Sequence, residues 1–272
     1  MAIECDRTLA GDVAVRLEQD GRVARIGYTL APACQGRGLA AEAVGAVVDR
    51  LFADVGVHRV EASIDGRNVP SARLLEGLGF ELEGTSPRSV WAKGEWTDDA
   101  RYGLDADGHA RWAARPRHRP TDVRLVEITS QNSAAVLALR THANEERFVA
   151  PVSGSFADAL FPGSVDGAPV VPWMRAVEAD GELVGFVMLA ERTASHPEAY
   201  LWRLLIDRRH QRRGIGDRVL DLLADRLRSE GQATLLVSWV PGRGSPEPFY
   251  LRRGFVPTGV VHDGEIEARL TL

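Results

Sequence analysis

Two glycine-containing turns carry the residue types that bind a diphosphate. Gln211-Arg-Arg-Gly-Ile-Gly216 repeats the pattern of Gln35-Gly-Arg-Gly-Leu-Ala40, which lies 176 residues earlier. Each turn follows an expected strand and opens an expected long helix, whose first four amides have no partner within the helix. The helix dipole favours an anion at that end, and glycine lets the backbone approach a ligand closely. Both turns are therefore expected to cradle a pyrophosphate through backbone amides.

Two other phosphate-binding motifs fit these turns poorly. A Walker loop needs lysine before serine or threonine, whereas the only lysine of the chain, Lys93, is followed by Gly94. A Rossmann turn needs a third glycine soon after the second, but Glu42 and 217–218 (Asp-Arg) occupy that region in the two copies. The sequence therefore excludes ATPases and GTPases of the Walker class and disfavours a dinucleotide site.

A second shared motif indicates that the two turns belong to two copies of one domain. Gly77-Leu-Gly-Phe-Glu81 is echoed by Arg253-Gly-Phe-Val256, with 175 residues between the glycines at 79 and 254. Two motifs that stay in phase, apart from one deletion, indicate an internal repeat. We expect a first copy over 1–110, a solvated linker rich in proline and arginine over 111–120, and a second copy over 121–272.

Hydrophobic periodicity and turn signals predict a similar order of elements in the two copies. The strands expected in the first copy are 12–19, 23–30, 59–64, 80–83 and 102–104. The strands expected in the second copy are 123–128, 173–179, 183–191, 199–206, 233–239, 255–261 and 265–272. Each copy also has a long amphipathic helix directly after its turn, ending at Gly56 or Gly231, and a short helix before its Gly-Phe motif.

The pattern Gln-x-x-Gly-x-Gly/Ala, followed about 45 residues later by Gly-Phe, resembles the GNAT family of acyl-CoA N-acyltransferases. The resemblance covers nearly the whole chain as a tandem. It implies an α/β fold with two GNAT domains, each a mixed, mostly antiparallel sheet flanked by helices. It also implies acetyl-CoA as cosubstrate, with the pyrophosphate at the turn and the pantetheine arm along the preceding strand, which splays from its neighbour. No metal is implied.

Carried onto this chain, the resemblance assigns cofactor binding to two matching sets of residues. The set in the second copy is Ile206, Gln211, Arg212, Arg213, Gly214, Ile215 and Gly216. The set in the first copy is Leu30, Gln35, Gly36, Arg37, Gly38, Leu39 and Ala40, together with Asn68 and Ser71.

The second copy is expected to perform the chemistry. In the family, a tyrosine four residues before Gly-Phe commonly protonates the leaving CoA thiolate, and Tyr250 holds that position. A phenol with a pKa of about 10 is protonated at neutral pH, so it can act as this acid; the alternative is a core tyrosine. The attacking amine must also lose a proton. Glu145, Glu146 and Glu191 are candidate bases that spacing does not separate.

The acceptor is expected to be a primary amine, and a small polyamine fits best. Stretches beginning at Asn144, Leu201 and Gly259 resemble bacterial spermine/spermidine acetyltransferases. Acidic side chains attract a polycation, and solvated loop carboxylates are the equal alternative for Glu145, Glu146, Asp263 and Glu265. A protein amino terminus and an antibiotic stay open as acceptors, and so does a CoA-binding scaffold without turnover.

The first copy is expected to be non-catalytic. It begins too late to hold the helices that cover the acceptor side, and Leu75 stands at the tyrosine position. The segment 68–80 resembles the ribosomal-protein-alanine acetyltransferase branch, from which Asn68 and Ser71 are carried over. Ser71 is a candidate proton donor, but a helix N-cap is the favoured role. We expect the missing helices to leave apolar surface that is buried against the second domain or against a second chain in a homodimer.

Composition sets the broad class. The 272 residues are 44% hydrophobic and 26% charged, which leaves room for two cores. A net charge of -5 argues against nucleic acid and anionic membranes as partners. No apolar run approaches the roughly 20 residues of a membrane span, and no secretory signal is visible. Because Cys5 and Cys34 are the only cysteines, a disulfide framework and a cysteine-built zinc site are excluded, and a cytoplasmic protein is expected.

Overall fold

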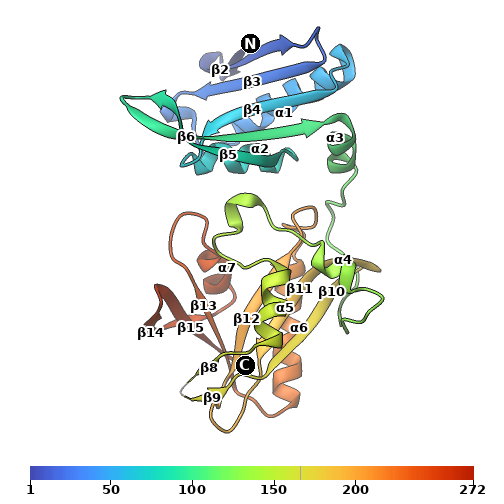
Figure 1. Ribbon diagram of the computed structural model, residues 1–272, viewed down its shortest axis with the longest axis vertical. Helices are drawn as coiled ribbons and strands as arrows, with labels where there is room; N and C mark the ends of the chain where they lie inside the picture. The colour runs from blue at the N-terminus through green and yellow to red at the C-terminus, as the bar shows by residue number, and fades with distance from the viewer. Residues whose placement is uncertain (166) are drawn as a thin grey trace. The chain divides into compact units, whose positions relative to one another are not determined.

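The computed structural model describes residues 1–165 and 167–272, and the chain divides into two compact units. Unit 1 is Met1–Arg115 and unit 2 is Pro116–Leu272. Each unit contains one large mixed sheet flanked by helices, coloured blue to green in unit 1 and green to red in unit 2 (Figure 1). The prediction of two such α/β sheets in tandem is confirmed.

Unit 1 is built on a six-stranded sheet in the order β1-β2-β3-β4-β6-β5, in which only β3 and β4 are parallel. Its strands are β1 Ala2–Cys5, β2 Thr8–Glu18, β3 Val23–Leu30, β4 Arg59–Asp65, β5 Glu81–Ala92 and β6 Glu95–Asp105. Its helices are α1 Leu39–Arg50, α2 Val69–Gly77 and α3 Ala106–Ala113. A π-helical turn, Leu51–Val55, extends α1 to Gly56, whose left-handed backbone (φ +73°) ends it where the sequence predicted.

One face of this sheet is covered by α1 and α2, which lie behind the strands in Figure 1. Val44 and Val48 of α1 and Leu75 of α2 pack with Ile26 and Val60, which point inward from β3 and β4. Alternate residues of the strands supply this core, because successive side chains of a strand point to opposite faces. The helix stripe predicted from the sequence is therefore the buried face of α1.

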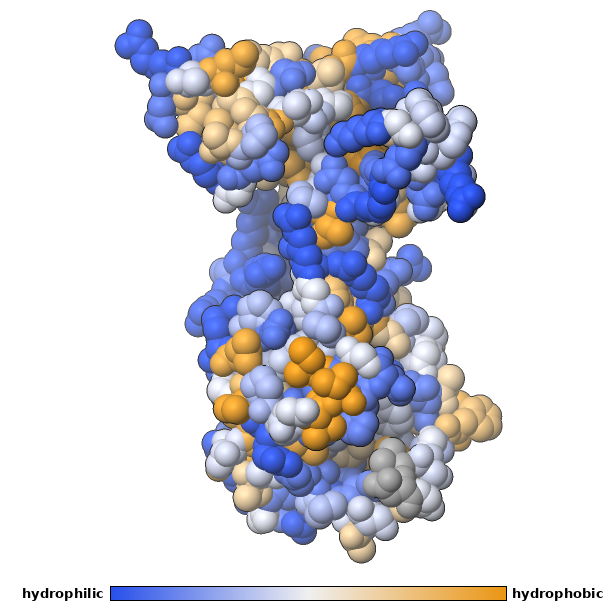
Figure 2. Space-filling view, turned by 90° about the vertical axis from the view of Figure 1, so that its left-hand side faces the viewer, coloured by the Kyte–Doolittle hydropathy of each residue, from blue (hydrophilic) through white to orange (hydrophobic). Residues whose placement is uncertain are grey.

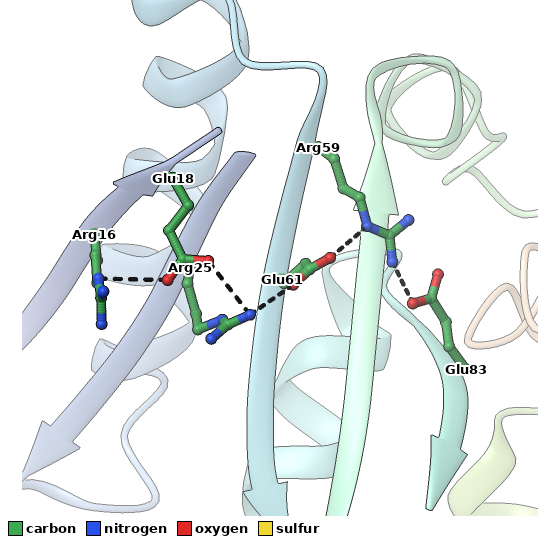
Figure 3. A network of polar contacts seen from close by, with 6 residues as sticks. All are labelled: Arg16, Glu18, Arg25, Arg59, Glu61 and Glu83. Atoms are coloured by element: carbon green, nitrogen blue, oxygen red, sulfur yellow. Dashed lines mark hydrogen bonds and ion pairs between the residues drawn. The ribbon is translucent and has the colours of Figure 1, made fainter. Parts of the chain in front are cut away.

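The opposite face of unit 1 is polar, which corrects the expectation of uncovered apolar surface. A chain of ion pairs crosses the sheet, as Figure 3 shows, through Arg16, Glu18, Arg25, Glu61, Arg59 and Glu83. A side chain at Gly103 of β6 would occupy the position of the Arg59 guanidinium, so glycine lets Arg59 cross β6 to reach Glu83. Exposed ion pairs contribute little stability, about 0–1 kcal/mol each, but charged residues make this face soluble without helices over it.

Unit 2 is built on a seven-stranded sheet in the order β14-β15-β13-β12-β11-β10-β7, in which only β12 and β13 are parallel. Its strands are β7 Val123–Val126, β10 Pro172–Ala179, β11 Glu182–Ala190, β12 Ala199–Ile206, β13 Thr234–Trp239, β14 Val256–His262 and β15 Glu265–Thr271, beside a small ladder of β8 Ser164–Val165 and β9 Ala168–Pro169. Its helices are α4 Ser133–Leu137, α5 Val152–Leu160, α6 Ile215–Ser229 and α7 Glu247–Arg252, with a 3₁₀ turn at Ala143–Glu145.

Both faces of this sheet are covered by helices. Val219, Leu223 and Leu227 of α6 pack on one face, against residues such as Leu201 of β12. Val136 of α4 and Val152 of α5 pack with Phe186 and Leu205 on the other face. The segment 130–155 thus supplies α4 and the start of α5, with the 3₁₀ turn between them.

The segment expected to be a solvated linker is shared between the units. Helix α3 extends to Ala113, and buried Trp112 donates from Nε1 to the Gly77 carbonyl (3.1 Å) within unit 1. The His118 carbonyl accepts from Arg213 Nε (2.8 Å) within unit 2. Prolines and like charges predict a solvated linker, but buried Trp112 at the end of α3 and the carbonyl of His118 anchor this segment to the two units.

Candidate active site

The parallel strands β12 and β13 part at the middle of the unit 2 sheet. They pair only through three residues of each, ending at Leu201 opposite Val237. Beyond that pair, the β12 segment from Trp202 to Ile206 has no ladder with β13. In unit 1 the matching pair, Ile26 opposite Ala62, ends the ladder of β3 and β4 in the same way. The splayed strand that the resemblance implied is therefore present in both units, with backbone groups open to a ligand on that side.

The turn after β12 leads directly into α6. Gly214 is the N-cap of α6 with a left-handed backbone (φ +77°), and Arg212 is also left-handed (φ +62°). The first bond of the helix runs from the Arg218 amide to the Gly214 carbonyl (3.2 Å), so the amides before Arg218 lie outside the helical ladder. Gln211 Nε2 donates to the Ile206 carbonyl (3.3 Å), which ties the turn to the end of β12. This is the geometry of an anion cradle.

The arginines of this turn have different surroundings. Arg213 is only 4% exposed; its Nη1 contacts His210 Nδ1 (2.8 Å), and its Nε donates to the His118 carbonyl. Burial lowers the pKa of His210, which favours the neutral ring that can accept from Arg213. Arg212, in the turn, and Arg218, in the first turn of α6, are exposed. Of the predicted residues, Arg213 therefore holds the turn through its side chain, whereas Arg212 is exposed.

Arg119 is a further cation at the turn. A Cβ atom at position 214 would lie 3.5 Å from Arg119 Nε, so the guanidinium lies over the N-cap. Arg119 itself is exposed. No sequence motif points to Arg119, because it lies 95 positions before Gly214, in the segment expected to be a linker.

Arg119→Ala is expected to weaken acetyl-CoA binding about five-fold, since one charge-assisted contact to a phosphate is lost. Titration calorimetry at low and high salt measures this, and the loss should shrink as salt screens the charge. Arg117→Ala is the matched control, because Arg117 is an exposed arginine of the same segment. Equal losses in both variants would show a general charge effect and contradict a specific contact.

The turn of unit 1 has the same backbone but different charges. Gly36 (φ +75°) and Gly38 (φ +82°) match Arg212 and Gly214, and Gln35 Nε2 donates to the Leu30 carbonyl (3.2 Å). Arg37, however, forms an ion pair with Asp6 (3.6 Å). Glu42 stands in the first turn of α1, where unit 2 has Arg218. Unit 1 thus keeps the cradle and has less positive charge around it.

Tyr250 lies in α7 beside the parted strands. Its side chain is 7% exposed and its ring stacks on Trp239 with centroids 5.7 Å apart. Trp239 is two residues beyond the last β12–β13 pair, and Phe249 and Phe255 pack edge-on against the tyrosine. Burial, with a smaller effect from Tyr200, raises the pKa of Tyr250 well above its usual value. The phenol therefore stays protonated at neutral pH.

The matching position in unit 1 is apolar. The Phe80 amide donates to the Leu75 carbonyl (3.0 Å), as the Phe255 amide donates to the Tyr250 carbonyl (3.1 Å). Leu75 is fully buried in the core of unit 1. Unit 1 therefore has no hydroxyl where unit 2 has Tyr250.

Asn68 and Ser71 have structural roles at the start of α2. Asn68 is the N-cap, and its Oδ1 accepts from the Ser71 amide (3.3 Å). The expectation that Ser71 caps the helix is therefore wrong, since Val69 and Pro70 already form the first turn. The Ser71 carbonyl accepts from Tyr28 (3.3 Å), whose hydroxyl bridges β3 and α2 near the parted strands.

The candidate acidic residues have separate surroundings. Glu145 Oε2 accepts from Gln211 Nε2 (2.7 Å), which links the 3₁₀ turn to the anion cradle, and Glu146 is exposed next to it. Glu191 is held by Arg226 of α6 (2.6 Å), so its carboxylate is engaged as an ion pair. Asp263 (φ +48°) forms the tight turn between β14 and β15.

A hydrogen-bonded chain that was not predicted from the sequence crosses three strands of unit 2. The Tyr200 hydroxyl of β12 lies 2.5 Å from Ser238 Oγ of β13, and Ser238 donates to Glu265 of β15. Only Glu265 was noticed as an acidic residue. The three residues are 38 and 27 positions apart, so no local spacing could reveal them; strand order brings them together.

The described residues contain neither a metal-ligating cluster nor a helix able to span a membrane. No group of three or more His, Cys, Asp or Glu side chains in residues 1–165 and 167–272 is arranged to hold a metal ion. None of the helices in those ranges combines the length and the apolar character that crossing a membrane requires.

Family comparisons match both units. A model described as "Acetyltransferase (GNAT) domain" matches residues 1–81, and one described as "Acetyltransferase (GNAT) family" matches residues 137–255. The second match contains the cradle and Tyr250.

Curated relatives match part of the chain. A probable N-acetyltransferase, YjcK, of Bacillus subtilis is 43% identical over 77 residues, which are 28% of this chain and 42% of the relative. The ribosomal protein uS5-alanine N-acetyltransferase of Escherichia coli is 34% identical over 73 residues, which are 27% and 38% of the two chains. The matched stretch thus spans less than half the length of these relatives.

Solved structures include partial matches. RimJ of Mycobacterium smegmatis in complex with CoA-disulfide is 30% identical with a TM-score of 0.37, over 41% of this chain and 56% of that one. Mutant forms of the spermidine/spermine N-acetyltransferase SpeG of Vibrio cholerae are 22% identical with a TM-score of 0.37, over 40% and 66%.

Proposed function

Since the chain carries two GNAT acetyltransferase domains in tandem, we propose that unit 2 transfers an acetyl group from acetyl-CoA to a primary amine. The observation that carries this is Tyr250, a buried, protonated phenol stacked on Trp239 where β12 and β13 part. Such a phenol suits the protonation of a leaving thiolate, because the sulfur at the end of the pantetheine arm would lie between the parted strands β12 and β13.

The proposed mechanism is direct attack. Backbone amides of the turn at Gly214 bind the diphosphate, and β12 from Trp202 to Ile206 offers backbone groups to the pantetheine arm. The neutral amine attacks the thioester carbon, the carbon–sulfur bond breaks, and Tyr250 gives its proton to the sulfur. Acetyl-CoA would supply the acetyl group, and the chain would supply position and proton transfer.

We propose a small cationic amine, such as a polyamine, as the acceptor. Glu145 lies beside the cradle through its bond to Gln211, and Glu146 is exposed next to it, so both carboxylates would attract a cation. A protein amino terminus is the second candidate, favoured by the similarity to the E. coli uS5-alanine N-acetyltransferase. An antibiotic acceptor and a CoA-binding scaffold without turnover remain alternatives.

A thiol-release assay tests the proposed function. The full chain is mixed with acetyl-CoA and a panel of polyamines, aminoglycosides and peptides with free amino termini, and free CoA thiol is measured over time. Turnover with a small polyamine supports the proposal, and turnover restricted to peptides favours the second candidate. Acetyl-CoA binding without turnover on any amine would favour the scaffold and contradict the enzyme.

We propose that unit 1 binds CoA weakly and does not turn over. Ser71→Ala is accordingly expected to leave kcat within about two-fold of the wild-type value, because the backbone of Ser71, and not its hydroxyl, bonds Asn68 and Tyr28. Steady-state kinetics with acetyl-CoA and the best amine measures this. A fall of kcat by about ten-fold or more would show that unit 1 contributes a proton donor.

We also propose a cytoplasmic protein that acts on small molecules and not on nucleic acid or a membrane. Cys5 and Cys34 are free thiols, as expected in a reducing compartment. A homodimer is a further proposal: Leu251, Val256, Val260 and Val261 are exposed along α7 and β14, and apolar side chains gather on the face of unit 2 turned to the viewer in Figure 2. Light scattering on the full chain distinguishes monomer from dimer.

A further inference from the structure

We propose that Tyr200, Ser238 and Glu265 form a proton-accepting chain for the attacking amine, with Tyr200 in contact with the amine and Glu265 as the final acceptor. This inference rests on the proposed function of unit 2. It assigns the base that the sequence left open to residues of the neighbouring strands β12, β13 and β15.

The geometry of the chain is continuous. Tyr200 is level with Leu236 of β13, so Ser238 is two residues further along on the same face, and its Oγ lies 2.5 Å from the Tyr200 hydroxyl. Ser238 is level with Glu267 of β15, so Glu265 is likewise two residues away on that face, and it accepts from Ser238. A proton can therefore pass between neighbouring oxygens from β12 to β15 without rearranging the sheet.

The chain lies on the face opposite the core of α6. Leu201, Val237 and Ala268, which alternate with the chain residues, are buried in that core. Tyr200 is level with Ala190 of β11, two residues from Met188, which packs under α4 and α5. The chain therefore lies on the same face of the sheet as α4 and α5, and Tyr200, Ser238 and Glu265 are each partly exposed there.

Tyr200 and Tyr250 approach the opening from different elements. Tyr200 comes from β12 and bonds Ser238 of β13, whereas Tyr250 comes from α7 and stacks on Trp239, the next residue of β13. Tyr200 also contributes to the raised pKa of Tyr250. The groups that act on Tyr200 are Ser238 of β13, Arg203 of its own strand, and Glu265 and Glu267 of β15. Burial raises the pKa of Tyr200 most, so its hydroxyl is protonated and can relay a proton only by passing its own to Ser238.

The proton balance of the step closes. The ammonium nitrogen gives one proton to the Tyr200 oxygen while Tyr200 passes its proton to Ser238 and Ser238 passes its own to Glu265. The amine nitrogen then bonds to the thioester carbon, the carbon–sulfur bond breaks, and the thiolate takes the proton of Tyr250. The nitrogen loses its second proton as the amide forms. Solvent removes the extra protons and restores Tyr250, so the products are an amide, CoA thiol and one proton.

The other candidate bases are less suited to this step. Glu191 is held in an ion pair by Arg226. Glu145 accepts from Gln211 at the anion cradle, where we place the diphosphate and not the reacting amine. Glu265, in contrast, is joined to the opening through two hydroxyl groups. The direct path therefore favours Glu265.

Unit 1 has no such chain at the matching positions. Aligning the last parallel pairs, Ile26 with Ala62 and Leu201 with Val237, places Arg25 at the position of Tyr200 and Ser63 at that of Ser238. Arg25 is ion-paired with Glu18 and Glu61, as Figure 3 shows. A fixed cation repels an ammonium group and accepts no proton, in agreement with the proposal that unit 1 does not catalyse acetyl transfer.

The test compares Tyr200→Phe, Ser238→Ala and Glu265→Gln with the control Glu267→Gln in the full chain. Glu267 lies on the same strand and face but accepts from Thr258 (2.8 Å). We expect each chain variant to lower kcat/KM for the amine about a hundred-fold near neutral pH, while calorimetric affinity for acetyl-CoA is unchanged and Glu267→Gln stays within about two-fold of wild type. Retained acetyl-CoA binding also shows that each variant is folded.

The pH profile separates a proton acceptor from a merely structural group. As pH rises toward the pKa of the amine, more amine is already neutral, so the defect of Glu265→Gln and Tyr200→Phe should shrink. A defect that is constant with pH, or no defect in any chain variant, would overturn the proton chain while leaving the acetyltransferase in place. Wild-type protein that binds acetyl-CoA but acetylates no amine would overturn the proposed function, and the chain with it.

Discussion

Tyr250→Phe is expected to lower kcat for amine acetylation about a hundred-fold, with KM for acetyl-CoA changed by no more than about two-fold. The substitution keeps the ring that stacks on Trp239 and packs on Phe249 and Phe255, so the core is retained. It removes only the proton that the leaving thiolate needs. Steady-state kinetics with thiol detection measures both constants.

Tyr102→Phe is the matched control for this prediction. Tyr102 is also a buried tyrosine with a raised pKa, but it lies in unit 1, where its hydroxyl donates to Glu76 (3.0 Å). Its loss should lower stability without lowering kcat. A Tyr250→Phe protein with normal kcat would show that water or another residue protonates the thiolate.

The raised pKa of Tyr250 also fixes the sign of a pH effect. Burial disfavours the phenolate, so the acid form of Tyr250 persists to higher pH than that of a free tyrosine. In the wild-type protein, kcat should therefore show no loss due to Tyr250 as pH approaches 10, the ordinary pKa of the group. The loss would appear only above that value.

The parts of the site that repeat within the chain could be predicted from sequence. Gly38 and Gly214 share a left-handed N-cap, and Gln35 and Gln211 each donate to the carbonyl five residues before. These features depend on local backbone, which a short motif specifies. The same holds for Gly56, which ends the extended α1 as expected.

Contacts that depend on strand order could not be predicted in this way. Tyr200, Ser238 and Glu265 meet because β12, β13 and β15 are neighbours in the sheet, and one bulge between Met188 and Leu189 of β11 shifts the register of β12. A sequence read without register leaves the facing residues undetermined. His118 and Arg119 similarly reach the turn through tertiary contacts.

The polar face of unit 1 could have been predicted from the sequence, although we expected this face to be apolar. On β3 and β4, Arg25, Gly27, Glu61 and Ser63 alternate with buried residues such as Ile26 and Ala62. Alternation of this kind predicts one buried and one solvated face. We expected an uncovered apolar face because the first copy lacks the helices that cover the acceptor side. The alternating charged residues show that this face of the sheet is solvated and needs no covering helices.

Gly214→Asp is expected to weaken acetyl-CoA binding ten-fold or more, that is, by at least about 1.4 kcal/mol. Two like charges about 4 Å apart near a protein surface repel by about 4 kcal/mol at an effective dielectric constant of 20, so even partial screening leaves enough. The carboxylate would also pair with Arg119, whose Nε lies 3.5 Å from a Cβ at this position, and so remove a cation from the diphosphate. Titration calorimetry on the full chain measures the change.

Gly214→Asn separates charge from backbone strain. The φ of +77° at Gly214 strains any side chain, but Asn and Asp tolerate the left-handed region better than other residues and have nearly the same shape. The difference between the two variants therefore reports the charge alone, and it should fall at high salt. Gly38→Asp makes the same change at the cradle of unit 1, where φ is +82°, and should leave the tight binding event intact. Unchanged affinity in Gly214→Asp would mean that the diphosphate does not bind at this turn, and a loss confined to Gly38→Asp would move the cofactor to unit 1.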